Sequence, residues 1–70
     1  MKTYCLKIEN KANRIHERYE KFEDVGEAAK FTAWLIRRDH EITKVNLFEC
    51  TDESMPKVRQ VKIATFYEYK

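Results

Sequence analysis

The chain has 70 residues, of which 37% are Asp, Glu, Lys or Arg, yet its formal net charge is only +2. A chain of this length forms one domain, residues 1–70, and its interspersed, nearly balanced charges argue against a concentrated basic patch for nucleic acid. A single glycine and a single proline exclude a glycine-rich phosphate-binding loop and a long flexible linker.

The first segment, KTYCLKIE (residues 2–9), alternates apolar and polar side chains in the manner of a strand with one buried face. Tyr4, Leu6 and Ile8 share one face of this predicted strand, and Cys5 lies on the other. The following NKAN predicts a turn, because asparagine tolerates the unusual backbone conformations that turns require.

Residues 14–22 allow two interpretations. Their apolar spacing is helical and continues into the next segment, which would give one long helix. Against this, Asp24 and Glu27 form the pattern of an N-terminal capping box, and Gly26 inside a helix would cost about 1 kcal/mol relative to alanine. We therefore predict a strand over 14–22.

The segment VGEAAKFTAWLIRR predicts a helix from Val25 to about Arg38. Its apolar residues fall on one broad face when they are spaced at the helical period. Two arginines in the last turn suit the negative end of the helix dipole.

Two further strands are predicted after the helix, ITKVNLFEC (42–50) and VRQVKIATFYEY (58–69), joined by a polar turn that contains Pro56. The order is β-β-α-β-β, an α+β fold. A right-handed crossover places the first strand beside the third, which gives a four-stranded, mainly antiparallel sheet of order 2-1-3-4. One helix packs on one face of this sheet.

A single helix leaves the other face of the sheet open. The side chains expected to face the helix are Tyr4, Leu6, Ile8, Val45, Leu47, Val61, Ile63, Thr65, Tyr67 and Tyr69. Those expected on the open face are Cys5, Phe48, Cys50, Ala64 and Phe66, together with Lys7, Lys44, Asn46 and Lys62. Apolar side chains on an open face indicate a binding surface, unless a bulge folds some of them inward or the tyrosines of the last strand cover them.

Two kinds of partner could bind the open face. One is a protein partner, which includes a second copy of the chain in a homodimer. The other is single-stranded nucleic acid, with bases stacked on Phe48 and Phe66 and phosphates bound by Lys44 and Lys62. The acidic residues Glu9 and Glu68 on or beside this face disfavour nucleic acid.

Trp34 falls almost opposite the core face of the predicted helix, among Lys30, Arg37 and Arg38. One interpretation is structural, with Trp34 lying over the sheet edge or against the loop at 39–41, and a cation–π contact would hold the ring there. The other is functional, because tryptophan and arginine are enriched at interface hot spots. Trp34 and Arg38 are therefore a second candidate patch for a partner.

A catalytic or metal site is not expected. Cys5, His16, His40 and Cys50 lack metal-ligand spacing, and no nucleophile motif is present. The N-terminal segment lacks the apolar run of a signal peptide, and no segment approaches a membrane span in length. We therefore expect a cytoplasmic protein with two free thiols, no cofactor and no membrane partner.

The stretch EAAKFTAWLI, which follows a capping segment and a hairpin, is similar in pattern to small accessory proteins of bacteriophages and prophages. That resemblance implies a compact domain of the anti-CRISPR kind, which inhibits a host protein by occupying its surface. The combined prediction is a non-enzymatic interaction domain that acts as a regulator or inhibitor, with nucleic-acid binding as the alternative.

Overall fold

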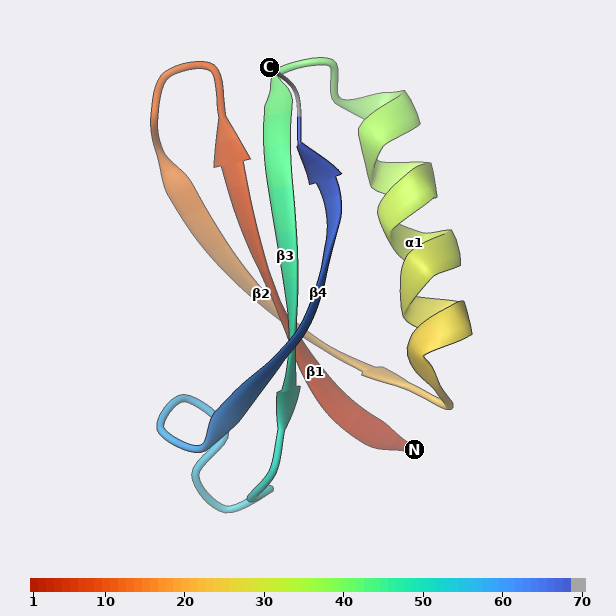
Figure 1. Cartoon of the computed structure of the whole chain (residues 1–70), viewed down its shortest axis with the longest axis vertical. Coiled ribbons are helices and arrows are strands. Elements are labelled where there is room, and N and C mark those ends of the chain that lie inside the picture. Colours follow the sequence, from red (N-terminus) through yellow and green to blue (C-terminus); the bar gives the residue numbers. More distant parts are fainter. Residues whose placement is uncertain (69–70) are drawn as a thin grey trace.

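The computed structural model of the protein describes residues 1–68 (Figure 1). Its elements are β1 (Lys2–Asn10), β2 (Ile15–Phe22), α1 (Val25–Arg38), β3 (Ile42–Cys50) and β4 (Gln60–Glu68). The four strands form one antiparallel sheet of order β2-β1-β3-β4, and α1 lies along one side of it. The predicted fold class, element order and strand order are confirmed.

The turn between β1 and β2 depends on two asparagines. Asn13 has a φ of 59°, in the left-handed region, which asparagine adopts more readily than most residues. The Asn10 side-chain oxygen accepts hydrogen bonds from the backbone N–H groups of Ala12 (3.0 Å) and Arg14 (3.1 Å). The chain reverses here, and residues 15–22 pair with β1 as predicted instead of extending α1.

The helix begins where the capping pattern predicts. Asp24 has an extended backbone, and its Oδ1 accepts a hydrogen bond from the Glu27 N–H at 2.9 Å, which satisfies one of the free amides of the first turn. At the other end, the Asp39 N–H donates to the Leu35 carbonyl at 2.9 Å. The predicted bounds of α1 are therefore confirmed.

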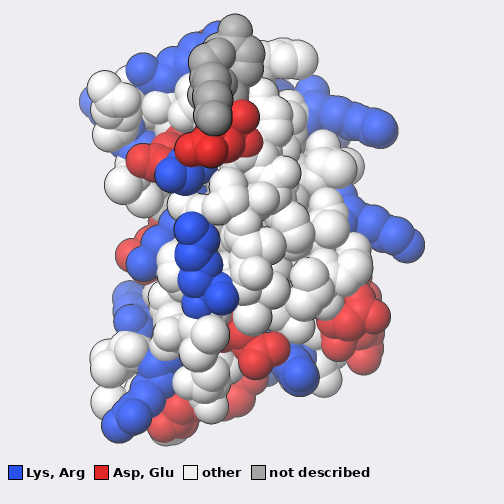
Figure 2. All heavy atoms as spheres, in the orientation of Figure 1, with Lys and Arg blue, Asp and Glu red and all other residues white. Residues whose placement is uncertain are grey.

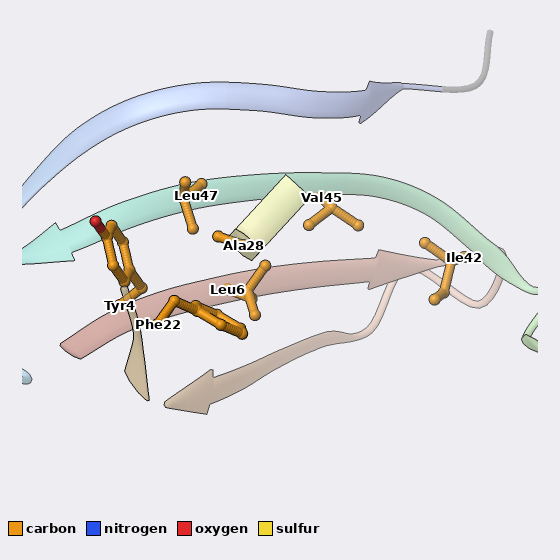
Figure 3. Packing of buried hydrophobic residues seen from close by; sticks show 7 residues of the cluster. All are labelled: Tyr4, Leu6, Phe22, Ala28, Ile42, Val45 and Leu47. Carbon is orange, nitrogen blue, oxygen red and sulfur yellow. The ribbon is translucent and has the colours of Figure 1, made fainter. Parts of the chain in front are cut away.

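The hydrophobic core lies between α1 and the sheet (Figure 3). Its buried members are Tyr4, Leu6, Phe22, Ala28, Ile42, Val45 and Leu47. Tyr4, Leu6, Val45 and Leu47 were expected on the helix side and are buried there, and Ile8 packs half-buried against them. Val61 and Ile63 were expected on the helix side too. Val61 pairs with Glu49, two residues from Leu47, so it does face that side, but it is 53% exposed and Ile63 is 41% exposed. Neither is part of the buried core.

The pairing of β4 with β3 is irregular at two places, both of them after Val61. Leu47 pairs with Ala64 while Phe48 pairs with Lys62, so Ile63 is an extra residue. Val45 pairs with Tyr67 while Asn46 pairs with Thr65, which makes Phe66 a second extra residue. Each such bulge reverses the faces of the residues beyond it.

Because of the two bulges, three residues of β4 lie on a different side of the sheet than strict alternation predicts. Ala64, expected on the open face, pairs with the core residue Leu47. Thr65, expected toward the helix, donates its hydroxyl hydrogen to Asn46 Oδ1 on the open face at 2.7 Å. Phe66, expected on the open face, packs half-buried against the core.

The last strand also starts later than its sequence suggests. The N–H groups of Val58 and Arg59 both donate to the Met55 carbonyl, at 3.1 and 3.0 Å, so these residues complete the preceding loop and β4 begins at Gln60. The end predicted at Tyr69 lies outside the described residues.

Candidate interaction surfaces

The open face of the sheet carries one row of side chains across all four strands. Tyr19 pairs with Cys5, Cys5 with Phe48, and Phe48 with Lys62. Directly paired residues of antiparallel strands point to the same side. The sequence therefore predicts the face of Cys5, Phe48 and Lys62 correctly, but not what covers them.

Both cysteines of the predicted binding surface are closed off from solvent. Cys5 is fully buried and Cys50 is 6% exposed. Gln60 Nε2 donates to Tyr19 Oη (3.2 Å) and to the Pro56 carbonyl (2.8 Å), and the Cys50 thiol donates to the same carbonyl (3.4 Å). Burial raises the pKa of both thiols above the ordinary 9.0. They are free, as predicted, but a partner cannot touch them on this folded surface.

Tyr19 and the loop 51–59 form the cover over this end of the open face. The Tyr19 hydroxyl donates to Glu17 at 2.8 Å and accepts from Gln60. The pKa of Tyr19 is raised, first by partial burial and second by the hydrogen bond to Glu17. Tyr19 therefore stays a neutral phenol at physiological pH and serves as a hydrogen-bonded cover.

The four residues of the nucleic-acid alternative do not come together. Phe48 is half-buried on the open face, with Lys7 Nζ 4.5 Å from its ring centroid, whereas Phe66 packs against the core. Lys44 forms an ion pair with Glu68 at 3.4 Å. Of the proposed stacking platform, Phe48 and the exposed Lys62 remain side by side.

A carboxylate ties the loop 51–59 to the first strand. The hydroxyl of the buried Thr3 donates to Glu53 Oε2 at 2.5 Å, and the Thr3 N–H donates to Oε1 at 3.2 Å. These bonds, led by the hydroxyl bond, lower the pKa of Glu53 below its ordinary 4.5. The ionised side chain of Glu53 thus holds the loop 51–59 against β1, in the position where it covers Cys50.

We expect this fastening to make stability depend on pH in the acid range. Because the folded pKa of Glu53 is depressed, its contribution is present above the unfolded value of 4.5 and is lost as pH falls through the lower folded value. Glu53→Gln should therefore flatten the decline of the unfolding free energy below pH 4.5. Urea titrations of both proteins at several pH values in this range measure the difference.

A second variant, Thr3→Val, removes the hydroxyl donor and should flatten the dependence of the unfolding free energy on pH in the same way. The same pH dependence in all three proteins would contradict the role assigned to Glu53.

The second predicted patch, around Trp34, is present as a stack of alternating cations and rings. Arg18 Cζ lies 4.9 Å from the Phe31 centroid, the Phe31 and Trp34 rings are stacked at 5.7 Å, and Arg38 Cζ lies 4.8 Å from the Trp34 centroid. Trp34 is 48% exposed. Because Arg18 belongs to β2, Trp34 stands on the flank of α1 toward the β2 edge, and the expected cation–π contact with Arg38 is confirmed.

The other flank of α1 leads to a surface that sequence reasoning missed. At helical spacing the flank away from Phe31 and Trp34 carries Val25, Ala29 and Ala33, which have small side chains. Beside it on β4 stand Val61, Ile63 and Phe66, of which the first two are exposed. We call these six residues the β4 strip.

Figure 2 shows the setting of this strip on the molecular surface. A continuous area free of Lys, Arg, Asp and Glu runs along β4 and between β4 and α1 (Figure 2). Basic side chains project on both of its long sides, and acidic ones lie near its two ends. The small residues at 29 and 33 were the available signal, but alternation placed Val61 and Ile63 in the core.

A concave site lies at the opposite end of the sheet from the loop 51–59. It is a hollow of about 260 Å³ lined by Lys11, His40, Ile42 and Tyr67. No group of three or more His, Cys, Asp or Glu side chains within residues 1–68 is arranged to hold a metal ion.

No protein-family model, curated protein or solved structure matches this chain. Across the described residues we find no helix with the length and apolar character that crossing a bilayer requires. The β4 strip holds three of the exposed large hydrophobic residues, Val25, Val61 and Ile63, and it stands apart from the covered open face.

Proposed function

We propose that this chain is a non-enzymatic interaction domain that binds another protein through the β4 strip and acts as its regulator or inhibitor. The observation that supports this is the exposure of Val61 and Ile63 beside an uncharged flank of α1. Contiguous apolar surface on a small domain is typical of a protein contact.

The energetics favour a protein occupant for this surface. Covering an exposed valine or isoleucine gains roughly 25 cal/mol for each Å² of apolar area removed from water. A nucleic-acid backbone would instead need cations within the contact, and the six residues of the strip carry none. A protein partner with its own apolar side chains obtains this gain directly.

The strip also suits a regulator better than a catalyst. None of its six residues has a titratable or nucleophilic side chain, so the surface offers no group for proton transfer. It can instead cover part of a partner protein and exclude water from the contact. A domain that covers a functional surface of another protein blocks access to it. This is the mode of action that we propose.

Two isoleucines on opposite edges of the sheet provide a matched test. Ile63 lies on β4 and is 41% exposed; Ile15 lies on β2 and is 60% exposed. We expect Ile63→Glu to reduce capture of the natural partner at least ten-fold, since a buried carboxylate without a partner is costly. Ile15→Glu should leave capture unchanged.

The measurement is crosslinking with a photoreactive phenylalanine at position 63 or 15, in cells that produce the protein. A defined adduct from position 63 that is absent from position 15 is the expected result. Adducts from position 15 alone, or equal capture by both glutamate variants, would show that the β4 strip is not the contact surface.

A further inference from the structure

We infer that the occupant of the β4 strip is an amphipathic helix of a different protein, with acidic residues beside its apolar face. This inference rests on the proposed function and specifies its partner. Three features of the described residues support it: the small flank of α1, the interrupted ladder of β4, and the charges that border the strip.

The small flank allows a second helix to lie close beside α1. Packed helices sit about 8–10 Å apart, and the distance is shortest where the contact residues are small. Ala29 and Ala33 are one turn apart on this flank, so they would face the incoming helix as a shallow surface. Val61 and Ile63 would then pack beneath its apolar side chains.

The irregular pairing of β4 disfavours an added strand as the occupant. A fifth strand would need a regular row of free backbone groups on β4, and the extra residues Ile63 and Phe66 interrupt that regularity. A helix satisfies its own backbone hydrogen bonds and needs only side-chain contacts. Along the 14 residues of α1, at about 1.5 Å per residue, a partner helix of about four turns matches the strip.

The border of the strip along α1 is basic. Lys30 and Arg37 follow Ala33 around the helix. Both are exposed, and neither belongs to an ion pair found within residues 1–68. Lys62 on β4 pairs with Phe48 and stands on the open face of the sheet. Glu49 pairs with Val61 in the sheet, but it already forms an ion pair with Lys2 at 3.6 Å. Acidic residues on the partner would complement this border.

The same charges disfavour a second copy of the chain. The apolar face of its α1 is already buried against its own sheet, so the uncovered flank that its helix could offer is that of Ala29 and Ala33, which Lys30 and Arg37 border. Placing that surface on the strip would bring like charges together, which costs free energy instead of gaining it.

Three synthetic helical peptides of about four turns test the inference. They share one leucine and alanine face and differ only in their polar residues, which are glutamate, lysine or glutamine. Each is titrated into isotope-labelled protein while backbone amide resonances are followed by NMR. We expect the glutamate peptide to shift the resonances of Ala29, Ala33, Val61 and Ile63 but not that of Ile15, with an affinity at least ten-fold above the lysine peptide. Raising the salt concentration should narrow that difference.

Neighbouring arginines give the matched control. Arg37 borders the strip, whereas Arg38 stacks on Trp34 on the other flank. Arg37→Glu should weaken binding of the glutamate peptide about five-fold at low salt, and Arg38→Glu should change it less than two-fold.

The outcomes separate this inference from the proposed function. If all three peptides bind the strip equally, or only the lysine peptide does, the acidic partner is wrong while the strip remains a binding surface. A dimer that Ile63→Glu converts to a monomer would likewise overturn the inference and keep protein binding. If no peptide moves these resonances at millimolar concentration, the helix occupant is wrong, and crosslinking from position 63 then decides the proposed function separately.

Discussion

Leu47→Ala should leave a large fraction of the chain unfolded at room temperature. Leu47 is fully buried at the centre of the core, between α1 and the sheet. Removing a buried leucine side chain costs about 2–5 kcal/mol, whereas a single core in a domain of this size supplies roughly 3–5 kcal/mol in total. The loss is therefore comparable to the whole stability.

Urea denaturation followed by circular dichroism measures this effect. Ile63→Ala is the control, because it shortens an aliphatic side chain that is 41% exposed on the adjacent strand, and we expect it to change the unfolding free energy by about 0.5 kcal/mol or less. A Leu47→Ala protein that loses under about 1 kcal/mol would mean that the core is not organised around this residue.

The two thiols should react far more slowly in the folded protein than in the unfolded one. Cys5 and Cys50 are buried, and burial raises the pKa of each thiol, so a reagent must wait for an opening that exposes them. If the opening of Cys5 requires global unfolding at about 3–5 kcal/mol, its reaction should be slowed by a factor of about a hundred to a few thousand.

Single-cysteine variants distinguish the two sites. Cys50 is covered by the loop 51–59 through its bond to the Pro56 carbonyl, so its protection should be smaller than that of Cys5, which lies inside β1 between two paired strands. The Cys5→Ala protein reports on Cys50 alone, and the Cys50→Ala protein reports on Cys5 alone. The ratio of their reaction rates with a disulfide reagent, with and without denaturant, gives the protection factor of each thiol. Equal and rapid reaction of both native thiols would contradict the burial described for the open face.

The features that the sequence predicts well are those set by local patterns. The alternation of Tyr4 and Leu6 and of Val45 and Leu47 predicts which side of β1 and β3 is buried, because no irregularity intervenes between these residues. The position of Asp24 predicts the start of α1, since its side chain acts on an amide only three residues away. The strand order then follows from the handedness of the crossover.

The features that it predicts badly depend on contacts between distant segments. In residues 61–67 the apolar side chains move from odd positions (Val61 and Ile63) to even ones (Ala64 and Phe66). This change indicates a break in the alternation but does not say which residues are extra, and each bulge reverses the faces that follow. The burial of Cys5 and Cys50 likewise depends on Tyr19, Gln60 and the loop 51–59, which come from other parts of the chain. These two effects together bury the two cysteines and take Phe66 off the open face, while Val61 and Ile63 of the β4 strip are exposed.

The bulges of β4 also affect how readily this chain can aggregate through its edge strand. An edge strand with exposed valine and isoleucine side chains is a template for intermolecular β-sheet growth and, ultimately, for amyloid. Such growth needs a flat strand with an unbroken row of free amides and carbonyls. The extra residues at Ile63 and Phe66 interrupt that row, and Lys62 places a charge within it. The strand that carries the exposed Val61 and Ile63 is therefore a poor template for fibril growth.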